Sequence, residues 1–378
     1  MDERSAGGDL DLCVWVRESL DPDPYRVIDP LAETDYWAEV VAVLSPIAPR
    51  VRRLRIASDF YMARELQPIL ACMMRFCTTG TIEILEITPW HRGPRLTRPV
   101  YRTKPHHNWR PTADQLNSFL SAVRVLRLRD VSLPFNSSAY HGLVELVIQS
   151  TGDFRLPNGE ELVQILLACP ALRSLSLENT YPTSPIPPHI ESISLKQLRC
   201  LELKCRSPEC LASFLGVLQL GSQKPTVKLN ICEEIEFVGH FRTFLERNTA
   251  VYALCVSPMD DKAWFPALRH GLSGLSILTL ERCDLADPSL IQHFEAEGLS
   301  PFTPWACLHT LRLEQCIVRL DLLEYLAGSR YLKRLTLVEC RVRNHDSEEL
   351  TPVAILEIAP IFAHSQHLTI SVESSGRD

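Results

Sequence analysis

Leu172-Arg173-Ser174-Leu175-Ser176-Leu177 is the stretch that decides the fold, because its leucine spacing, L-x-x-L-x-L, returns along the whole sequence. In a β-strand, residues two apart face the same way, so the last two leucines point to one side and the residue between them to the other. A single strand with one apolar side cannot bury that side alone, so each copy needs neighbours. Four further full copies begin at Leu198, Leu275, Leu308 and Leu332.

Weaker copies of the same frame extend the repeat over most of the chain. Two of them, Leu229/Ile231 and Leu368/Ile370, keep only the second half of the frame. Strict alternation at Leu10, Leu12, Val14 and Val16 predicts one more strand, the thirteenth. The weaker copies that keep all three positions are Val51/Leu54/Ile56, Ile82/Leu85/Ile87, Val123/Leu126/Leu128, Leu143/Leu146/Ile148 and Val251/Leu254/Val256.

Helical patterns alternate with these strands. Apolar residues recur at steps of three and four over 160–167, 210–215 and 320–326, as in an amphipathic helix. Asp287-Pro288 indicates another helix start, with proline at the first position. Alternating strands and helices predict a parallel sheet. The predicted fold is therefore α/β: a horseshoe-shaped leucine-rich-repeat solenoid with about 12–13 parallel strands on its concave face and helices on its convex face.

We expect one domain from this pattern. Residues 10–372 form a single solenoid with an insertion at 90–112, between disordered ends at 1–9 and 373–378. No stretch is apolar enough for a membrane span, and the charged N-terminus is not a signal peptide. The net charge of −7 disfavours nucleic acid as a partner. We expect a monomer in the cytoplasm or nucleus.

The 13 cysteines lie mostly in apolar runs, which indicates reduced, buried thiols. No CxxC pair or zinc spacing occurs, and we predict no metal at Cys200, Cys205 and Cys210. Cysteines five residues after the second leucine of the last three full copies are predicted to cap the turn that leaves the strand. They are Cys283, Cys316 and Cys340.

Catalytic motifs are missing from the sequence. GxSxG, HExxH, P-loop and GxGxxG patterns do not occur, and His106-His107 has no nearby carboxylate. We therefore expect no enzyme, no catalytic residues and no cofactor.

Three stretches carry a family resemblance: 126–134, 142–148 and 161–177. They resemble the repeat region of F-box/leucine-rich-repeat proteins of the type expanded in mushroom-forming fungi. The resemblance implies an F-box that docks on the Skp adaptor of a cullin ubiquitin ligase, and repeats that hold a substrate. No F-box is found before the first predicted strand. Adaptor binding is therefore expected only if an F-box lies outside this chain.

Residues that flank and separate the two leucines of each strand form the predicted partner face. The face is expected to be basic near the N-terminus and mixed elsewhere, and it is either a solvated surface or a binding surface. Its candidate contacts are Arg53, Arg55, Arg127, Arg129, Glu178, Glu202, Arg312 and Arg334.

The insertion at 90–112 is the second candidate surface. It contains no Asp or Glu and is rich in arginine and aromatic residues, which are enriched at binding hot spots. It is either a solvated loop or a contact for an acidic or phosphorylated protein segment. Its candidate contacts are Trp90, Arg92, Arg95, Arg98, Tyr101, Arg102 and Trp109.

Two functions fit these observations. The first is a protein-interaction scaffold that serves as the substrate-recognition part of an F-box ubiquitin-ligase receptor. The alternative is an F-box-independent scaffold or a regulatory, inhibitor-type binding protein.

Overall fold

The computed structural model shows two compact units, Met1–Leu156 and Pro157–Asp378. Each unit is built on a parallel sheet whose strands follow the order of the chain. The described residues are 9–16, 38–58, 63–77, 80–89, 113–130, 133, 135, 137–150, 157–178, 184–204, 207–231, 235–258, 274–286, 307–329, 331–343, 350–352, 361–362 and 367–373.

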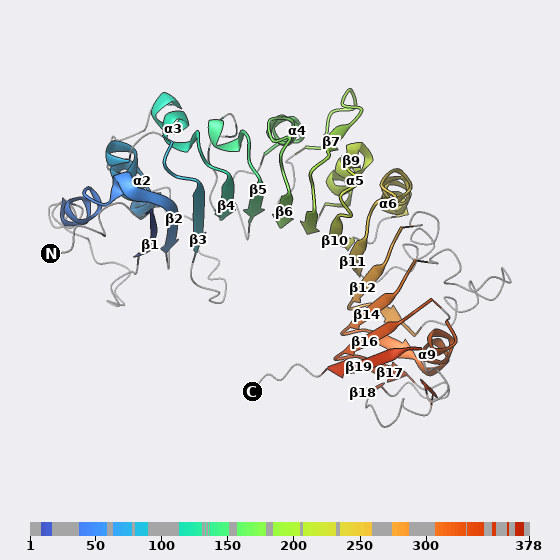
Figure 1. Ribbon diagram of the computed structural model, residues 1–378. Coiled ribbons are helices and arrows are strands. Elements are labelled where there is room, and N and C mark those ends of the chain that lie inside the picture. The colour runs from blue at the N-terminus through green and yellow to red at the C-terminus, as the bar shows by residue number, and fades with distance from the viewer. Residues whose placement is uncertain are drawn as a thin grey trace, which may run out of the picture. The chain divides into compact units, whose positions relative to one another are not determined.

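The first unit has five parallel strands, each paired with the next along the chain. Helices α2 and α3 lie on one side of these strands (Figure 1). Residues 38–44 are also helical. The strands are β1 (Leu10–Val16), β2 (Val51–Ser58), β3 (Ile84–Pro89), β4 (Val125–Arg129) and β5 (Glu145–Gln149). The helices are η2 (Ala48–Arg50), α2 (Ala63–Phe76), α3 (Ala113–Leu120) and η3 (Ser138–Tyr140).

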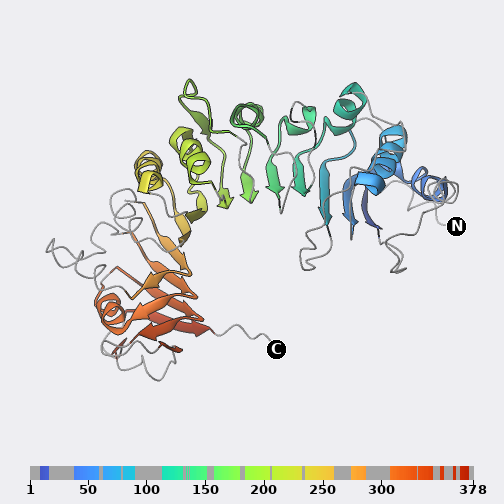
Figure 2. The same ribbon diagram turned by 180° about the vertical axis from the view of Figure 1, so that it is seen from behind.

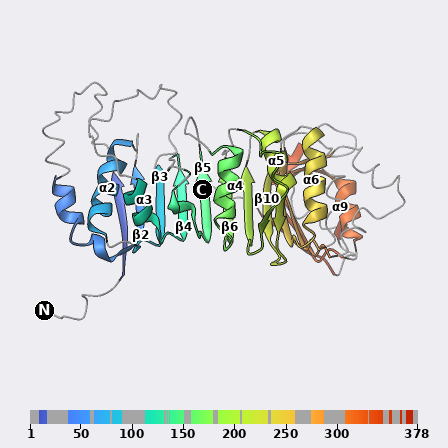
Figure 3. The same cartoon turned by 90° about the horizontal axis from the view of Figure 1, so that it is seen from above.

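The second unit has eight parallel strands in its main sheet. They are β6 (Ser174–Glu178), β8 (Cys200–Lys204), β10 (Thr226–Ile231), β11 (Ala253–Pro258), β12 (Ile277–Glu281), β14 (Thr310–Glu314), β16 (Arg334–Val338) and β19 (Thr369–Glu373). Its helices, which lie on one side of that sheet (Figures 2 and 3), are α4 (Gly159–Leu167), α5 (Pro208–Val217), α6 (Ile235–Arg247) and α9 (Leu320–Ala327).

Short strands add two small sheets to the second unit. In one, β7 (Ile193–Leu195) pairs with β9 (Leu218–Leu220) in parallel. In the other, β13 (Asp284–Leu285), β15 (Ile317–Arg319) and β17 (Arg341–Arg343) run in parallel, and β18 (Leu350–Pro352) pairs with β17 antiparallel.

The repeated leucines form the core. Leu175 and Leu177 lie on β6 and are buried beneath it, and Leu172 is buried just before the strand begins. The Leu172 N–H donates to the Cys169 carbonyl at 3.0 Å, which fixes the turn into the strand. Burial of each such leucine contributes roughly 1.5–3 kcal/mol to stability. Because the same three positions are buried in copy after copy, the chain is an α/β leucine-rich-repeat solenoid, as predicted.

All thirteen predicted strands are present, five in the first unit and eight in the second. The predicted frame was wrong at β10, where Val227 and Leu229, not Leu229 and Ile231, align with the leucine pair of β8. It was also wrong at β19, where Ile370 and Val372 align with the pair of β16. In both strands β-branched residues take core positions that leucine holds elsewhere, and a shift of two residues keeps the same side inward.

The three predicted helices are confirmed as α4, α5 and α9. Helix α4 begins with a capping box, in which the Asn158 side chain accepts from the Glu161 N–H at 2.8 Å. The Glu161 carboxylate accepts from the Asn158 N–H at 2.9 Å. This exchange satisfies two backbone donors that the first turn leaves free. The predicted helix start at Asp287-Pro288 lies outside the described residues.

Candidate protein-binding face

The open face is the side of each sheet opposite the buried leucines. Each strand places on it the residue between the two leucines and the residues that flank them, because side chains alternate along a strand. The parallel register lines these residues up in rows across the sheet. In the second unit the middle row is Ser176, Glu202, Lys228, Cys255, Thr279, Arg312, Thr336 and Ser371.

The arginines of β2 are paired across strands of the first unit. Arg53 lies 2.9 Å from the carboxylate of Asp11 on β1, and Arg55 lies 2.8 Å from that of Glu86 on β3. Both arginines keep nearly half of their side-chain surface exposed, at 48% and 45%. Each is therefore held in position but remains accessible to a partner.

Arg127 on β4 continues this pattern. Its guanidinium lies 2.6 Å from Glu145 and 3.5 Å from Glu86, and its hydrogen bond to Glu145 raises its pKa. Arg129 is exposed and makes no ion pair with any described residue. The described open face of this unit carries four arginines and the three acids Asp11, Glu86 and Glu145, so most of its positive charge is neutralised within the sheet.

In the second unit, two glutamates that were predicted as partner contacts, one on β6 and one on β8, form ion pairs with the same lysine. Lys204 Nζ lies 3.4 Å from Glu178 and 3.2 Å from Glu202. The Ser176 hydroxyl donates to Glu202 at 3.2 Å. Glu178 and Glu202, which were predicted as contacts, therefore belong to one cross-strand cluster.

Glu281 forms a second cluster that spans three strands. Its carboxylate accepts from Lys228 Nζ at 2.9 Å and from the Cys255 thiol at 3.0 Å. Burial alone would raise the pKa of Glu281, but these two donors lower it below its ordinary value. Burial and the hydrogen bond to Glu281 raise the pKa of Cys255, which therefore stays a thiol.

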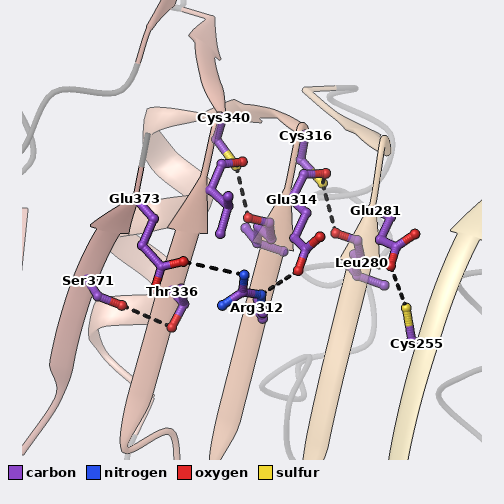
Figure 4. Close-up of polar contacts among 12 residues, drawn as sticks. Cys255, Leu280, Glu281, Arg312, Glu314, Cys316, Thr336, Cys340, Ser371 and Glu373 are labelled. Carbon is purple, nitrogen blue, oxygen red and sulfur yellow. Dashed lines mark hydrogen bonds and ion pairs between the residues drawn. The ribbon is translucent and has the colours of Figure 1, made fainter. Parts of the chain in front are cut away.

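Arg312 is the centre of a third cluster (Figure 4). It forms ion pairs with Glu314 on its own strand and with Glu373 on β19, the latter at 3.4 Å. Beside it, the Ser371 hydroxyl donates to the Thr336 hydroxyl at 3.0 Å. Arg334 begins β16, is exposed and has no ion-pair partner in the described part of the chain.

The turns that follow β12, β14 and β16 carry a row of hydrogen-bonded side chains that was not predicted from the sequence. Arg282, Gln315 and Glu339 follow these strands with φ values of +60°, +55° and +50°. Arg282 Nε donates to the Gln315 side chain at 3.0 Å, and Gln315 Nε2 donates to Glu339 at 2.6 Å. The usual signal for a left-handed residue is glycine, asparagine or aspartate, and none stands at these positions.

The next residue in each of these turns is a buried cysteine, and its predicted capping role is confirmed. The Cys316 thiol donates to the Leu280 carbonyl at 3.3 Å, and the Cys340 thiol to the Leu313 carbonyl at 3.2 Å (Figure 4). Each bond ties a turn to the preceding repeat. A side-chain hydrogen bond with Cys283, together with burial, raises the pKa of Cys316 to about 12, so this thiol stays protonated at neutral pH.

A shallow hollow of about 400 Å³ lies beside these turns. It is lined by Gln315, Cys316, Ile317, Glu339 and Arg341. Both charges on its rim are at the surface, so it resembles a contact point for one partner side chain more than an enclosed ligand site.

Among the described residues, no group of three or more His, Cys, Asp or Glu side chains could hold a metal ion. In the same part of the chain, no helix is both long and apolar enough to cross a membrane.

The structure places all the predicted strand residues on the open face, distributed over the two units. The predicted contacts in the insertion lie outside the described residues. They are Trp90, Arg92, Arg95, Arg98, Tyr101, Arg102 and Trp109.

Comparison with known proteins gives a likeness among solved structures. No family model matches the chain, and no curated protein matches it. Among solved structures, an internalin from Listeria monocytogenes is similar over 85% of this chain and 80% of its own, with 12% identity and a TM-score of 0.38.

Proposed function

We propose that this chain is a protein-interaction scaffold that binds its partner on the open face of the second unit. The observation that carries the proposal is the set of cross-strand charge clusters centred on Lys204, Glu281 and Arg312. Their partly exposed side chains stand on rigid strands in fixed positions. Charges held in this way favour a partner with the complementary pattern and cost little ordering entropy on binding.

A narrower proposal is that the partner is a ubiquitin-ligase substrate. It rests on the resemblance of the repeats to those of F-box proteins, and it requires an F-box outside this chain to recruit the Skp adaptor. The alternative is an F-box-independent scaffold or an inhibitor-type binding protein.

We also infer a monomer that works in a reducing compartment, the cytoplasm or nucleus. All eleven cysteines that the structure describes are free thiols, and six of them are buried. A secreted chain with so many cysteines usually pairs them as disulfides.

Affinity purification with mass spectrometry tests the proposal. The intact chain is compared with Glu281→Ala/Arg312→Ala on the open face and with Glu324→Ala on α9 as the matched control. We expect partners that are retained by the control and lost from the open-face variant, with all three proteins unfolding at similar temperatures. Identical partner sets for all three would contradict the proposal.

The same experiment distinguishes the ubiquitin-ligase role from an F-box-independent scaffold. Recovery of the Skp adaptor with a protein extended by an upstream F-box, together with an open-face partner, supports the ligase role. Open-face partners without the adaptor support the free scaffold. A variant lacking residues 90–112 tests the insertion, for which unchanged partners would exclude a binding role.

A further inference from the structure

The edge at which the strands of the second unit begin carries a set of basic side chains. We call this the basic edge. All its basic members are exposed, and they precede strands β8, β10 and β16 or lie just before β6. They are Arg173, Lys196, Arg199, Lys224 and Lys333.

Backbone hydrogen bonds fix this arrangement. The Arg199 N–H donates to the Arg173 carbonyl at 2.8 Å, and the Thr226 N–H donates to the Arg199 carbonyl at 2.8 Å. The Lys333 N–H donates to the His309 carbonyl at 2.9 Å. Equivalent residues of successive repeats are thus stacked, so Arg173 and Arg199 are about one strand spacing, ~4.8 Å, apart, whereas Lys333 lies four strand spacings beyond β10.

These cations lack the ion-pair partners that most cations on the open face of this unit have. None of them forms an ion pair with a described residue, whereas Lys204, Lys228 and Arg312 all do. The described segments that build the edge, 169–174, 195–200, 221–226, 248–253, 274–277, 307–310, 331–334 and 367–369, contain no Asp or Glu. Basic groups that have no counter-charge among the described residues favour an external anion.

Aromatic residues lie among the cations. Tyr252 precedes β11 and is 37% exposed, and the Lys224 Nζ lies 5.6 Å from its ring centre. Tyr331, just before Lys333, is 45% exposed. The contact between Lys224 and Tyr252 is a cation–π interaction, and tyrosine is among the residues enriched at protein-binding hot spots.

Glutamates lie at the opposite ends of five strands of this unit. Glu178, Glu281, Glu314 and Glu373 end β6, β12, β14 and β19, and Glu339 follows β16. These glutamates and the net charge of the chain, −7, disfavour the binding of a long polyanion such as nucleic acid. A short acidic segment can lie along the basic edge alone.

We propose that the basic edge binds an extended acidic protein segment that crosses the strands from β6 to β16. Six strand spacings separate β6 from β16, roughly 29 Å, which an extended segment of about nine residues covers. Aspartate and glutamate side chains of the segment pair with Arg173, Arg199 and Lys333, and the Tyr252 ring packs against its backbone. This site is separate from the open face. The test of peptide binding at the basic edge can therefore fail while the proposed open-face function is still supported.

Fluorescence anisotropy with a labelled peptide of nine glutamates tests the site on the full chain. We expect binding that weakens about tenfold in Arg173→Glu/Arg199→Glu and weakens steeply with salt, because exposed charges are screened. The double variant Arg173→Lys/Arg199→Lys should keep most of the affinity. The double variant Arg75→Glu/Arg242→Glu, with exposed positions on helices α2 and α6, changes the charge by the same amount without touching the edge and should leave binding within about twofold.

Three outcomes would overturn the proposal. The first is equal affinity of the wild type and the charge-reversal variant, with circular dichroism melts showing both folded. The second is an equal loss in Arg75→Glu/Arg242→Glu, which would mean that net charge alone controls binding. The third is tighter binding of a nine-nucleotide single-stranded DNA, or of vesicles containing phosphatidylserine, than of the peptide through these same arginines.

Discussion

Glu281 shows how the open face holds a charge in place. Its side chain is only 22% exposed, yet it stays ionised because Lys228 and Cys255 donate to it from two other strands. Arg55 and Arg312 are likewise paired with carboxylates. A partner therefore meets a pattern of alternating charge, so specificity comes from matching positions and not from net attraction.

Replacement of Glu281 by glutamine should change the pH dependence of stability. The folded-state pKa of Glu281 lies below the ordinary value of 4.5, so its ionised form stabilises the fold above that pH. This stabilisation is lost as pH falls through the folded-state pKa. We expect Glu281→Gln to be less stable at pH 7, by up to about 1 kcal/mol, and the difference to shrink below about pH 4.5. Urea unfolding from pH 7 to pH 3 measures it.

The exposed Glu324→Gln on α9 serves as the control and should keep the wild-type stability at pH 7. A stability gap between Glu281→Gln and the wild type that stays constant down to pH 3 would show that the carboxylate of Glu281 is not stabilised by its donors.

The repeats of β12, β14 and β16 each consist of a strand followed by a left-handed turn. The left-handed conformation of Arg282, Gln315 and Glu339 costs about 1–2 kcal/mol each. Backbone bonds offset this cost, since the Arg282 N–H donates to the Glu314 carbonyl and the Gln315 N–H to the Val338 carbonyl, both at 2.7 Å. The thiols of the following cysteines add a bond to the preceding repeat in two of the three turns.

Helix α4 is the element whose start depends most clearly on named side chains. Because Asn158 caps the first turn and Glu161 completes the capping box, Asn158→Ala should lower the free energy of unfolding by about 1 kcal/mol. The neighbouring Glu160→Ala, exposed and outside the box, should change it by less than about 0.5 kcal/mol. Urea unfolding of both variants checks this, and equal effects would argue against the cap.

Strands and helices were predicted from the sequence more completely than side-chain contacts were. Buried leucines recur at fixed steps, so strands and helices follow from local pattern. Ion pairs depend on the register between repeats, as in Lys228–Glu281 and Arg312–Glu373, whose members lie 53 and 61 residues apart. Left-handed turns at charged or amide residues give no local signal. The basic edge was missed because its members occupy positions outside the L-x-L pair.

At the scale of the whole molecule, each strand contacts mainly the repeats before and after it. In β14, Leu311 aligns with Leu278 of β12 and Leu335 of β16, and all three are buried. Stability in such a chain is close to a sum of repeat and nearest-neighbour terms. Loss of a core side chain should therefore destabilise the adjoining repeats first.

Leu311→Ala tests this expectation. Loss of a fully buried leucine leaves a cavity and should cost roughly 2–5 kcal/mol. Hydrogen exchange read by mass spectrometry should quicken in β12, β14 and β16 of the second unit, while β2 and β3 of the first unit exchange at the wild-type rate. Glu324→Ala, on the exposed side of α9, should quicken neither. Equal acceleration in both units would mean that the two open together, and the chain would then unfold as one cooperative block instead of repeat by repeat.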